Sequence, residues 1–62
     1  MADFTPEEIE QFREQFRKLN EELKRLGGTA FKEMPGDIND VVKSIKFLSN
    51  EINDIKMMYL QI

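Results

Sequence analysis

Side chains that could act as nucleophiles are few in this chain. It contains no His and no Cys, and its hydroxyl groups belong to Thr5, Thr29, Ser44, Ser49 and Tyr59. Nucleophilic catalysis needs an activated Ser, Thr or Cys beside a general base. The sequence offers no such pair, so we expect a protein that is not an enzyme and uses no cofactor.

Acidic residues could bind metals, but their spacing lacks the required companions. Glu10 and Glu14 share one face of a predicted helix, yet the Glu-x-x-His motifs of a di-iron bundle site are absent. Residues 37–40 (Asp-Ile-Asn-Asp) are similar to the start of a calcium loop. Val41 occupies the fifth position of that loop, however, and the Gly of its sharp turn is missing. We therefore predict no metal site.

Charge and hydropathy narrow the classes of partner. The net charge is −3 and the sequence pI is about 4.8, whereas nucleic-acid binding depends on a positively charged surface. No apolar run approaches the roughly 18–20 residues of a membrane span. We expect a soluble, intracellular protein, cytoplasmic by default, that binds neither nucleic acid nor membranes.

The strongest pattern in the sequence is an apolar repeat with alternating steps of three and four residues, which predicts helices that bury one seam against a partner. A strict heptad also favours a supercoiled seam over a straight helix. In the C-terminal half the repeat comprises Ile38, Val41, Ile45, Leu48, Ile52, Ile55, Tyr59 and Ile62. In the N-terminal half it comprises Ile9, Phe12, Phe16, Leu19, Leu23 and Leu26.

Local signals divide the chain into four segments. Residues 1–5 are a lead-in that ends in Thr5, which can form a capping box with Glu8 ahead of a first helix at 6–26. Residues 27–36 form a connector that begins with two glycines, could form one helical turn from Thr29, and ends in a Pro-Gly break. Asp37 is a good cap for a second helix at 37–62.

The apolar residues outside the repeat suggest further contacts. Phe31 and Met34 lie in the connector, where we expect them to cover the end of the helix pair; the alternative is an exposed docking knob. Phe47 lies on the face opposite the seam. No Gly, Pro or basic last turn ends the helix at Met57 to Ile62, so we expect a coiled coil that continues beyond Ile62.

These patterns predict an all-α, two-helix (helix–loop–helix) chain with two competing architectures. In one, the helices form an antiparallel hairpin, and hairpins pair into a four-helix bundle. In the other, the 38–62 helices of different chains form a parallel coiled coil with the first helix folded back on its outside. We favour a combination of both, a helical hairpin within a parallel homo-oligomer. The mixed Ile, Val and Leu seam specifies the oligomer number only weakly. A homodimer is favoured because dimers are the commonest oligomers, with a trimer close behind.

Two functions fit this architecture. The first is structural: an oligomerisation module, the N-terminal coiled-coil segment of a longer scaffold, filament or tail-like assembly protein. The second is a small helical adaptor or regulator that binds another protein's helix in an apolar groove. The seam residues given above are the predicted oligomer and core interface, and the predicted contacts with other partners are Phe31, Met34, Phe47, Met57 and Met58.

Overall fold

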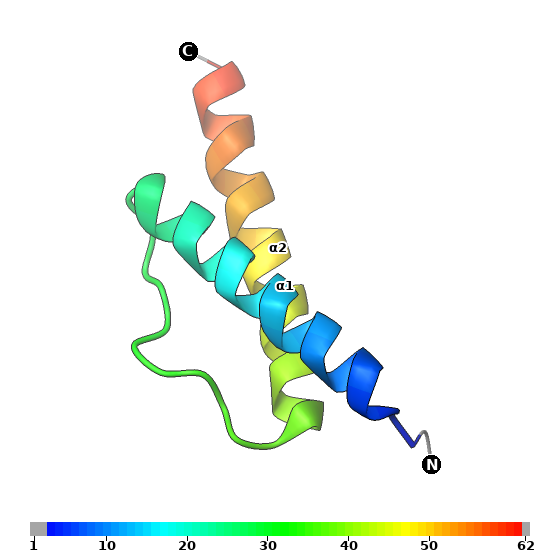
Figure 1. Ribbon diagram of the computed structural model, residues 1–62. Coiled ribbons are helices and arrows are strands. Elements are labelled where there is room, and N and C mark those ends of the chain that lie inside the picture. The colour runs from blue at the N-terminus through cyan, green and yellow to red at the C-terminus, as the bar shows by residue number, and fades with distance from the viewer. Residues whose placement is uncertain (1–2, 62) are drawn as a thin grey trace.

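A computed structural model describes residues 3–61, which form two helices. Helix α1 spans Pro6–Arg25 and helix α2 spans Ile38–Leu60, and the two pack against each other as a helical hairpin (Figure 1). The protein is elongated, with extents of 43 × 21 × 15 Å. The all-α class predicted from the apolar repeat is confirmed.

The start of α1 is fixed by the predicted capping box. The Glu8 N–H donates to Thr5 Oγ1 over 3.2 Å, and the Thr5 N–H donates to Glu8 Oε1 over 2.9 Å. Both bonds satisfy backbone donors that the first helical turn leaves free. Hydrogen bonding with Thr5 holds the pKa of the Glu8 carboxyl below its ordinary value of 4.5. The Thr5 backbone N–H contributes most to this lowering, and the Thr5 hydroxyl contributes next.

Replacing Glu8 by Gln is expected to reduce the loss of stability that the protein suffers in acid. A carboxyl whose pKa is lower in the folded chain stabilises it above the unfolded pKa, and this contribution disappears as the pH falls through the folded pKa. Urea unfolding should therefore separate wild type from Glu8→Gln at neutral pH and bring them closer together at acidic pH. Glu10→Gln controls for net charge. An equal gap at both pH values would contradict the prediction.

The end of α1 brings it close to α2. Gly27 adopts the left-handed conformation with φ 85°, and the N–H groups of Gly27 and Gly28 donate to the carbonyls of Lys24 and Leu23 over 3.1 and 3.0 Å. This pair of bonds is the Schellman ending predicted by the double glycine. A Cβ on Gly28 would collide with the Leu23 side chain and lie 3.1 Å from Ile55 Cδ1. A side chain at Gly28 would therefore push α1 and α2 apart.

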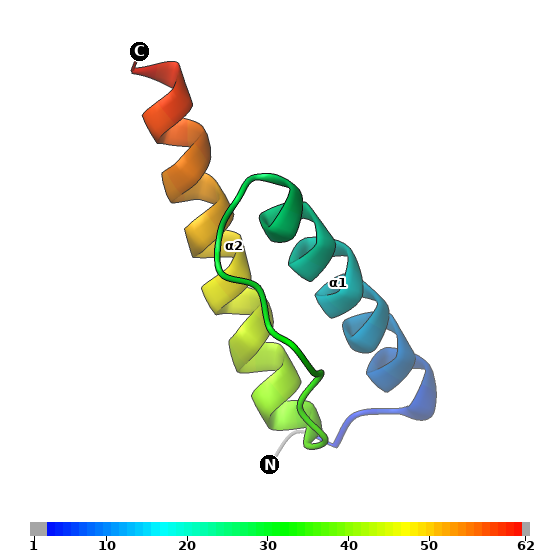
Figure 2. The same ribbon diagram turned by 90° about the vertical axis from the view of Figure 1, so that its left-hand side faces the viewer.

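The two helices run in the same direction, so the antiparallel arrangement expected for the hairpin is wrong. Figures 1 and 2 show that both helices begin at the same end of the molecule, and the connector runs back beside them. The Glu22 carboxylate at the end of α1 lies 3.0 Å from the Lys56 ammonium, and Gly28 faces Ile55.

The connector makes this direction feasible because it is extended. Ten extended residues reach about 33 Å, whereas α2 rises only about 26 Å from Ile38 to Ile55. Residues 29–33 accordingly contain no helix, so the helical turn that Thr29 could have capped does not form.

The core lies along the line where the helices meet. Its buried apolar residues are Phe16, Leu23, Val41, Leu48 and Ile52. Ser44 is also buried, and its hydroxyl donates to the Asp40 carbonyl over 2.7 Å, so no buried polar atom of the described side chains lacks a partner. Partly buried residues pack around this core: Phe12, Leu19, Leu26, Phe31, Met34, Ile38, Ile45 and Ile55.

Asn20 fastens the connector to one side of the helix pair. Its side-chain amide donates to the Phe31 carbonyl over 2.9 Å and accepts from the Phe31 N–H over 2.8 Å. The Phe31 ring then lies between Phe16 and Phe47, with centroids 5.4 and 5.9 Å away. Phe31 therefore covers the side of the helix pair, and not its end as predicted, because the connector runs along the helices.

Candidate functional site

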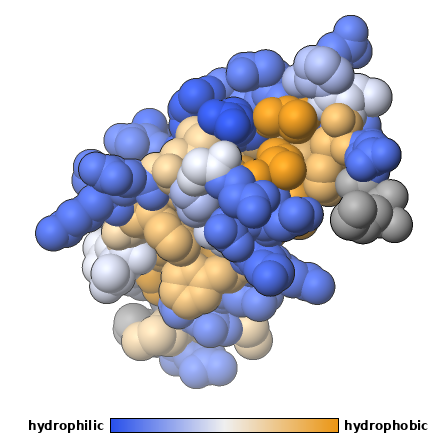
Figure 3. Space-filling view, turned by 90° about the horizontal axis from the view of Figure 1, so that it is seen from below, coloured by the Kyte–Doolittle hydropathy of each residue, from blue (hydrophilic) through white to orange (hydrophobic). Residues whose placement is uncertain are grey.

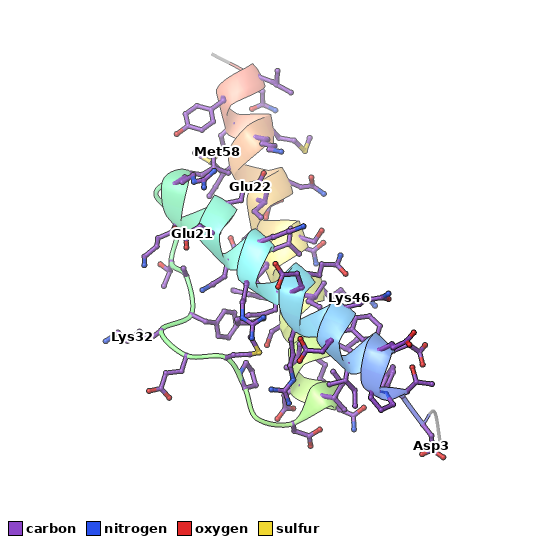
Figure 4. All side chains as sticks on the ribbon, in the orientation of Figure 1. Asp3, Glu21, Glu22, Lys32, Lys46 and Met58 are labelled. Carbon is purple, nitrogen blue, oxygen red and sulfur yellow. The ribbon has the colours of Figure 1, made fainter. Side chains whose placement is uncertain are left out.

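The last turn of α2 extends beyond α1 and forms an overhang, which we define as residues 57–61. Gly28, just past the end of α1, lies beside Ile55, and no segment of the described chain covers the overhang (Figure 1). Figure 4 shows Met58 beyond the end of α1, past Glu22. The four apolar side chains of the overhang are largely exposed, at 58% for Met57, 67% for Met58, 59% for Tyr59 and 85% for Leu60.

Apart from Gln61 at its end, the overhang is apolar around its circumference. Consecutive helical residues point about 100° apart, so residues 57–60 face four different directions. It carries no charged side chain, and the preceding Lys56 is engaged with Glu22. A helix that is apolar on all sides is normally buried. The overhang therefore has the composition of an interior segment in an exposed position.

A second exposed apolar surface lies on the side of the hairpin away from the connector, which we call the open side. Asn20, which holds the connector, and Glu22, which pairs with Lys56, point about 200° apart on α1. The connector and the Glu22–Lys56 pair therefore lie on opposite sides. Seen from the end where both helices begin, orange apolar surface lies among blue hydrophilic side chains (Figure 3).

On the open side, α2 bears an open depression with an apolar floor and polar edges. Half-buried Val42 and Ile45 belong to it. The lining residues are Val42, Ile45, Lys46, Ser49 and Asn50. Another open depression, on α1, is charged and lined by Arg17, Lys18, Glu21, Glu22 and Arg25. Within residues 3–61 no three acidic side chains converge where a metal ion could bind.

The predicted seam residues divide into three groups. Most belong to the core or are partly buried and pack against it, and Ile9 is half-buried. Tyr59 is exposed on the overhang, and Ile62 lies outside the described residues. Of the predicted partner contacts, Phe31 and Met34 pack against the core, whereas Met57, Met58 and the 47% exposed Phe47 face outward.

Three structural residues do not follow from the apolar repeat. Asn20 holds the connector, Gly28 permits the close approach to Ile55, and Ser44 occupies a buried place beside Val41 and Leu48. All three are polar or lack a side chain, so a hydrophobic pattern does not mark them. For Ser44 the one available signal is the residue type itself, because the hydroxyl of a helical Ser can bond the backbone carbonyl four residues earlier.

Comparison of the chain with protein-family models, curated proteins and solved structures gave no match. Among the described residues, neither helix has the length and apolar character needed to cross a membrane. The candidate contact surfaces are therefore the two apolar ones, the overhang and the open side.

Proposed function

We propose that the protein is a structural self-association module, which joins copies of its chain within a larger helical assembly. The overhang is the observation that supports this function best. It exposes Met57, Met58, Tyr59 and Leu60 together at the C-terminal end of α2. Single exposed apolar residues are ordinary, but a contiguous apolar surface marks a contact site.

The size of the chain supports the same function. A single core in a protein this small rarely supplies more than about 3–5 kcal/mol of stability, and the buried core here comprises Phe16, Leu23, Val41, Leu48 and Ile52. Fully burying a large apolar side chain contributes about 1.5–3 kcal/mol. Covering the overhang with another copy would therefore add substantially to folded-state stability and make it dependent on concentration.

Replacing Met57 and Leu60 by Gln is expected to abolish self-association while leaving the helices intact. Both side chains are exposed in the single chain, and Gln is nearly as good a helix former as Leu or Met. Sedimentation equilibrium should show a concentration-dependent oligomer for wild type and a monomer for the double variant. Far-UV circular dichroism at low concentration should be the same for both.

A matched control is Lys32→Gln with Glu33→Gln, which changes two exposed positions of the connector without altering the net charge and should leave the oligomer unaltered. A wild-type chain that stays monomeric at high concentration would overturn the proposed function. A double variant that associates as tightly as wild type would show that the overhang is not the contact.

A second candidate function is the binding of a different protein's helix. The adjacent Met57 and Met58 favour it, because methionine side chains adapt to varied apolar partners. An adaptor of this kind would be monomeric alone and would gain order when a partner helix is added. The sedimentation measurement separates it from the structural role.

A further inference from the structure

We infer that two copies associate antiparallel through α2, so that the overhang of each lies on the open side of the other near Val42. This inference depends on the proposed self-association and adds the partner's orientation and the surface that receives the overhang. Three features of the molecule support it: the distribution of charge, the spacing of residues along α2, and the side on which the connector lies.

Charge is separated along the molecule because both helices begin at the same end (Figure 2). The starting halves of the helices, residues 3–14 and 37–43, carry seven acidic and two basic side chains, a net charge of −5. The ending halves, residues 15–26 and 44–60, carry six basic and four acidic side chains, a net charge of +2. Two parallel helix dipoles offset only about one charge at each end.

This separation favours one orientation of a second copy. In a parallel pair, the two acidic ends would lie together and repel each other. In an antiparallel pair, the basic end of each copy lies beside the acidic end of the other. Charges interact appreciably within about 10 Å at moderate salt, which is the distance between packed helices. The antiparallel orientation is therefore the electrostatically complementary one.

The spacing along α2 gives the register. Val42 and Leu60 are eighteen residues apart, which is about five helical turns, so both point to the same side of α2. A two-fold axis at their midpoint, beside Glu51, places Leu60 of each copy opposite Val42 of the other. The contact is then self-complementary, as a two-fold dimer requires.

The residues of α2 between these two contacts would allow the α2 helices of the two copies to approach each other closely. Ser49 and Asn53 each point within about 20° of the direction of Val42 and Leu60 and are short and exposed. Lys46 falls level with Lys56 of the second copy, whose charge is already offset by the Glu22 carboxylate at 3.0 Å. The connector lies on the other side of the hairpin, held by Asn20, and does not obstruct the contact.

Engineered cysteines test the orientation directly, since the chain has none of its own. We expect a mixture of the single variants Val42→Cys and Leu60→Cys to form the mixed disulfide under mild oxidation, in large excess over either self-linked dimer. Mass spectrometry distinguishes the products. The matched control is Asp40→Cys mixed with Leu60→Cys, because Asp40 is at nearly the same level as Val42 but about 200° around α2.

Each result bears on a different proposal. Predominant Leu60→Cys self-linkage in a protein that sediments as a dimer would establish a parallel pair and overturn the orientation, while self-association stands. Equal cross-linking from Val42→Cys and Asp40→Cys would overturn the proposed surface. A chain that sediments as a monomer would overturn the proposed function itself.

The unmodified protein provides a second measurement. Sodium chloride screens charge, so the dissociation constant of an antiparallel dimer is expected to rise several-fold between low and high salt. A parallel dimer would be strengthened, because screening weakens the repulsion between its acidic ends. A dissociation constant that falls with added salt would therefore contradict the inferred orientation.

Discussion

Replacing Leu48 by Ala is expected to unfold most of the protein at room temperature. Leu48 has no exposed surface and belongs to the core with Leu23 and Val41. A buried Leu-to-Ala change costs about 2–5 kcal/mol, and a single core in a chain this small rarely supplies more than about 3–5 kcal/mol. The loss therefore equals most or all of the available stability. Far-UV circular dichroism and urea unfolding at low protein concentration measure it.

The neighbouring Ser49→Ala variant is the matched control. Ser49 is exposed, and exposed substitutions usually change stability by less than about 0.5 kcal/mol. Ser49→Ala should therefore unfold at nearly the wild-type urea concentration. A Leu48→Ala variant with a wild-type unfolding midpoint would show that α1 does not pack over Leu48.

The helices themselves were predictable because their signals are local. Thr5, Pro6 and Glu8 mark the start of α1, the double glycine marks its end, and Asp37 starts α2 by accepting a hydrogen bond from the Asn39 N–H over 2.9 Å. Each signal acts within one helical turn. The predicted start and end of the first helix and the predicted start of the second lie within about one residue of the observed ones, whereas the predicted end at residue 62 lies outside the described residues.

The direction of packing was not predictable in the same way. A ten-residue connector is long enough either to turn back at once or to run the length of α2, so its length leaves both directions open. Tertiary contacts between distant residues accompany the observed direction: Asn20 with the Phe31 backbone, and Gly28 with Ile55. An apolar repeat contains no information about either contact.

The heptad interpretation was only partly informative about the buried face. Val41, Leu48 and Ile52 are buried, but Ser44 takes an inner position and the predicted seam residue Ile45 is only half-buried. A chain that covers α2 with its own α1 needs no strict heptad, since a straight helix averages 3.6 residues per turn. The coiled-coil oligomer remains a prediction.

The exposure of the overhang could be predicted from the sequence only in part. Met57 and Met58 were predicted as partner contacts because they widen the apolar band at the end of the repeat, and both are exposed. Tyr59 was predicted to lie in the seam, and it is exposed in the single chain. The reason is the alignment of the helices: Gly28, just past the end of α1, lies beside Ile55, and that alignment depends on the connector.

Replacing Asn20 by Asp is expected to detach the connector at neutral pH. The Asn20 amide both donates to and accepts from the Phe31 backbone, whereas a carboxylate only accepts. The Phe31 carbonyl would lose its donor and face a negative charge, and an unsatisfied, partly buried polar group costs about 1–3 kcal/mol. Phe31 would then leave Phe16 and Phe47. Amide hydrogen exchange at Phe31 and urea unfolding should both report the loss, whereas Gln15→Glu, the same amide-to-carboxylate change at an exposed position of α1, should leave both unchanged.

The same variant should recover in acid, which distinguishes a lost hydrogen bond from a general packing defect. Once protonated, the carboxyl that Asn20→Asp introduces can again donate to the Phe31 carbonyl, so folding favours its neutral form and raises its pKa. A raised carboxyl pKa means that the folded chain binds more protons, so the variant's stability relative to wild type increases as the pH falls. The stability gap between Asn20→Asp and wild type should therefore narrow from neutral pH to about pH 3. A gap that stays constant would indicate that Asn20 acts through its volume and not through its amide.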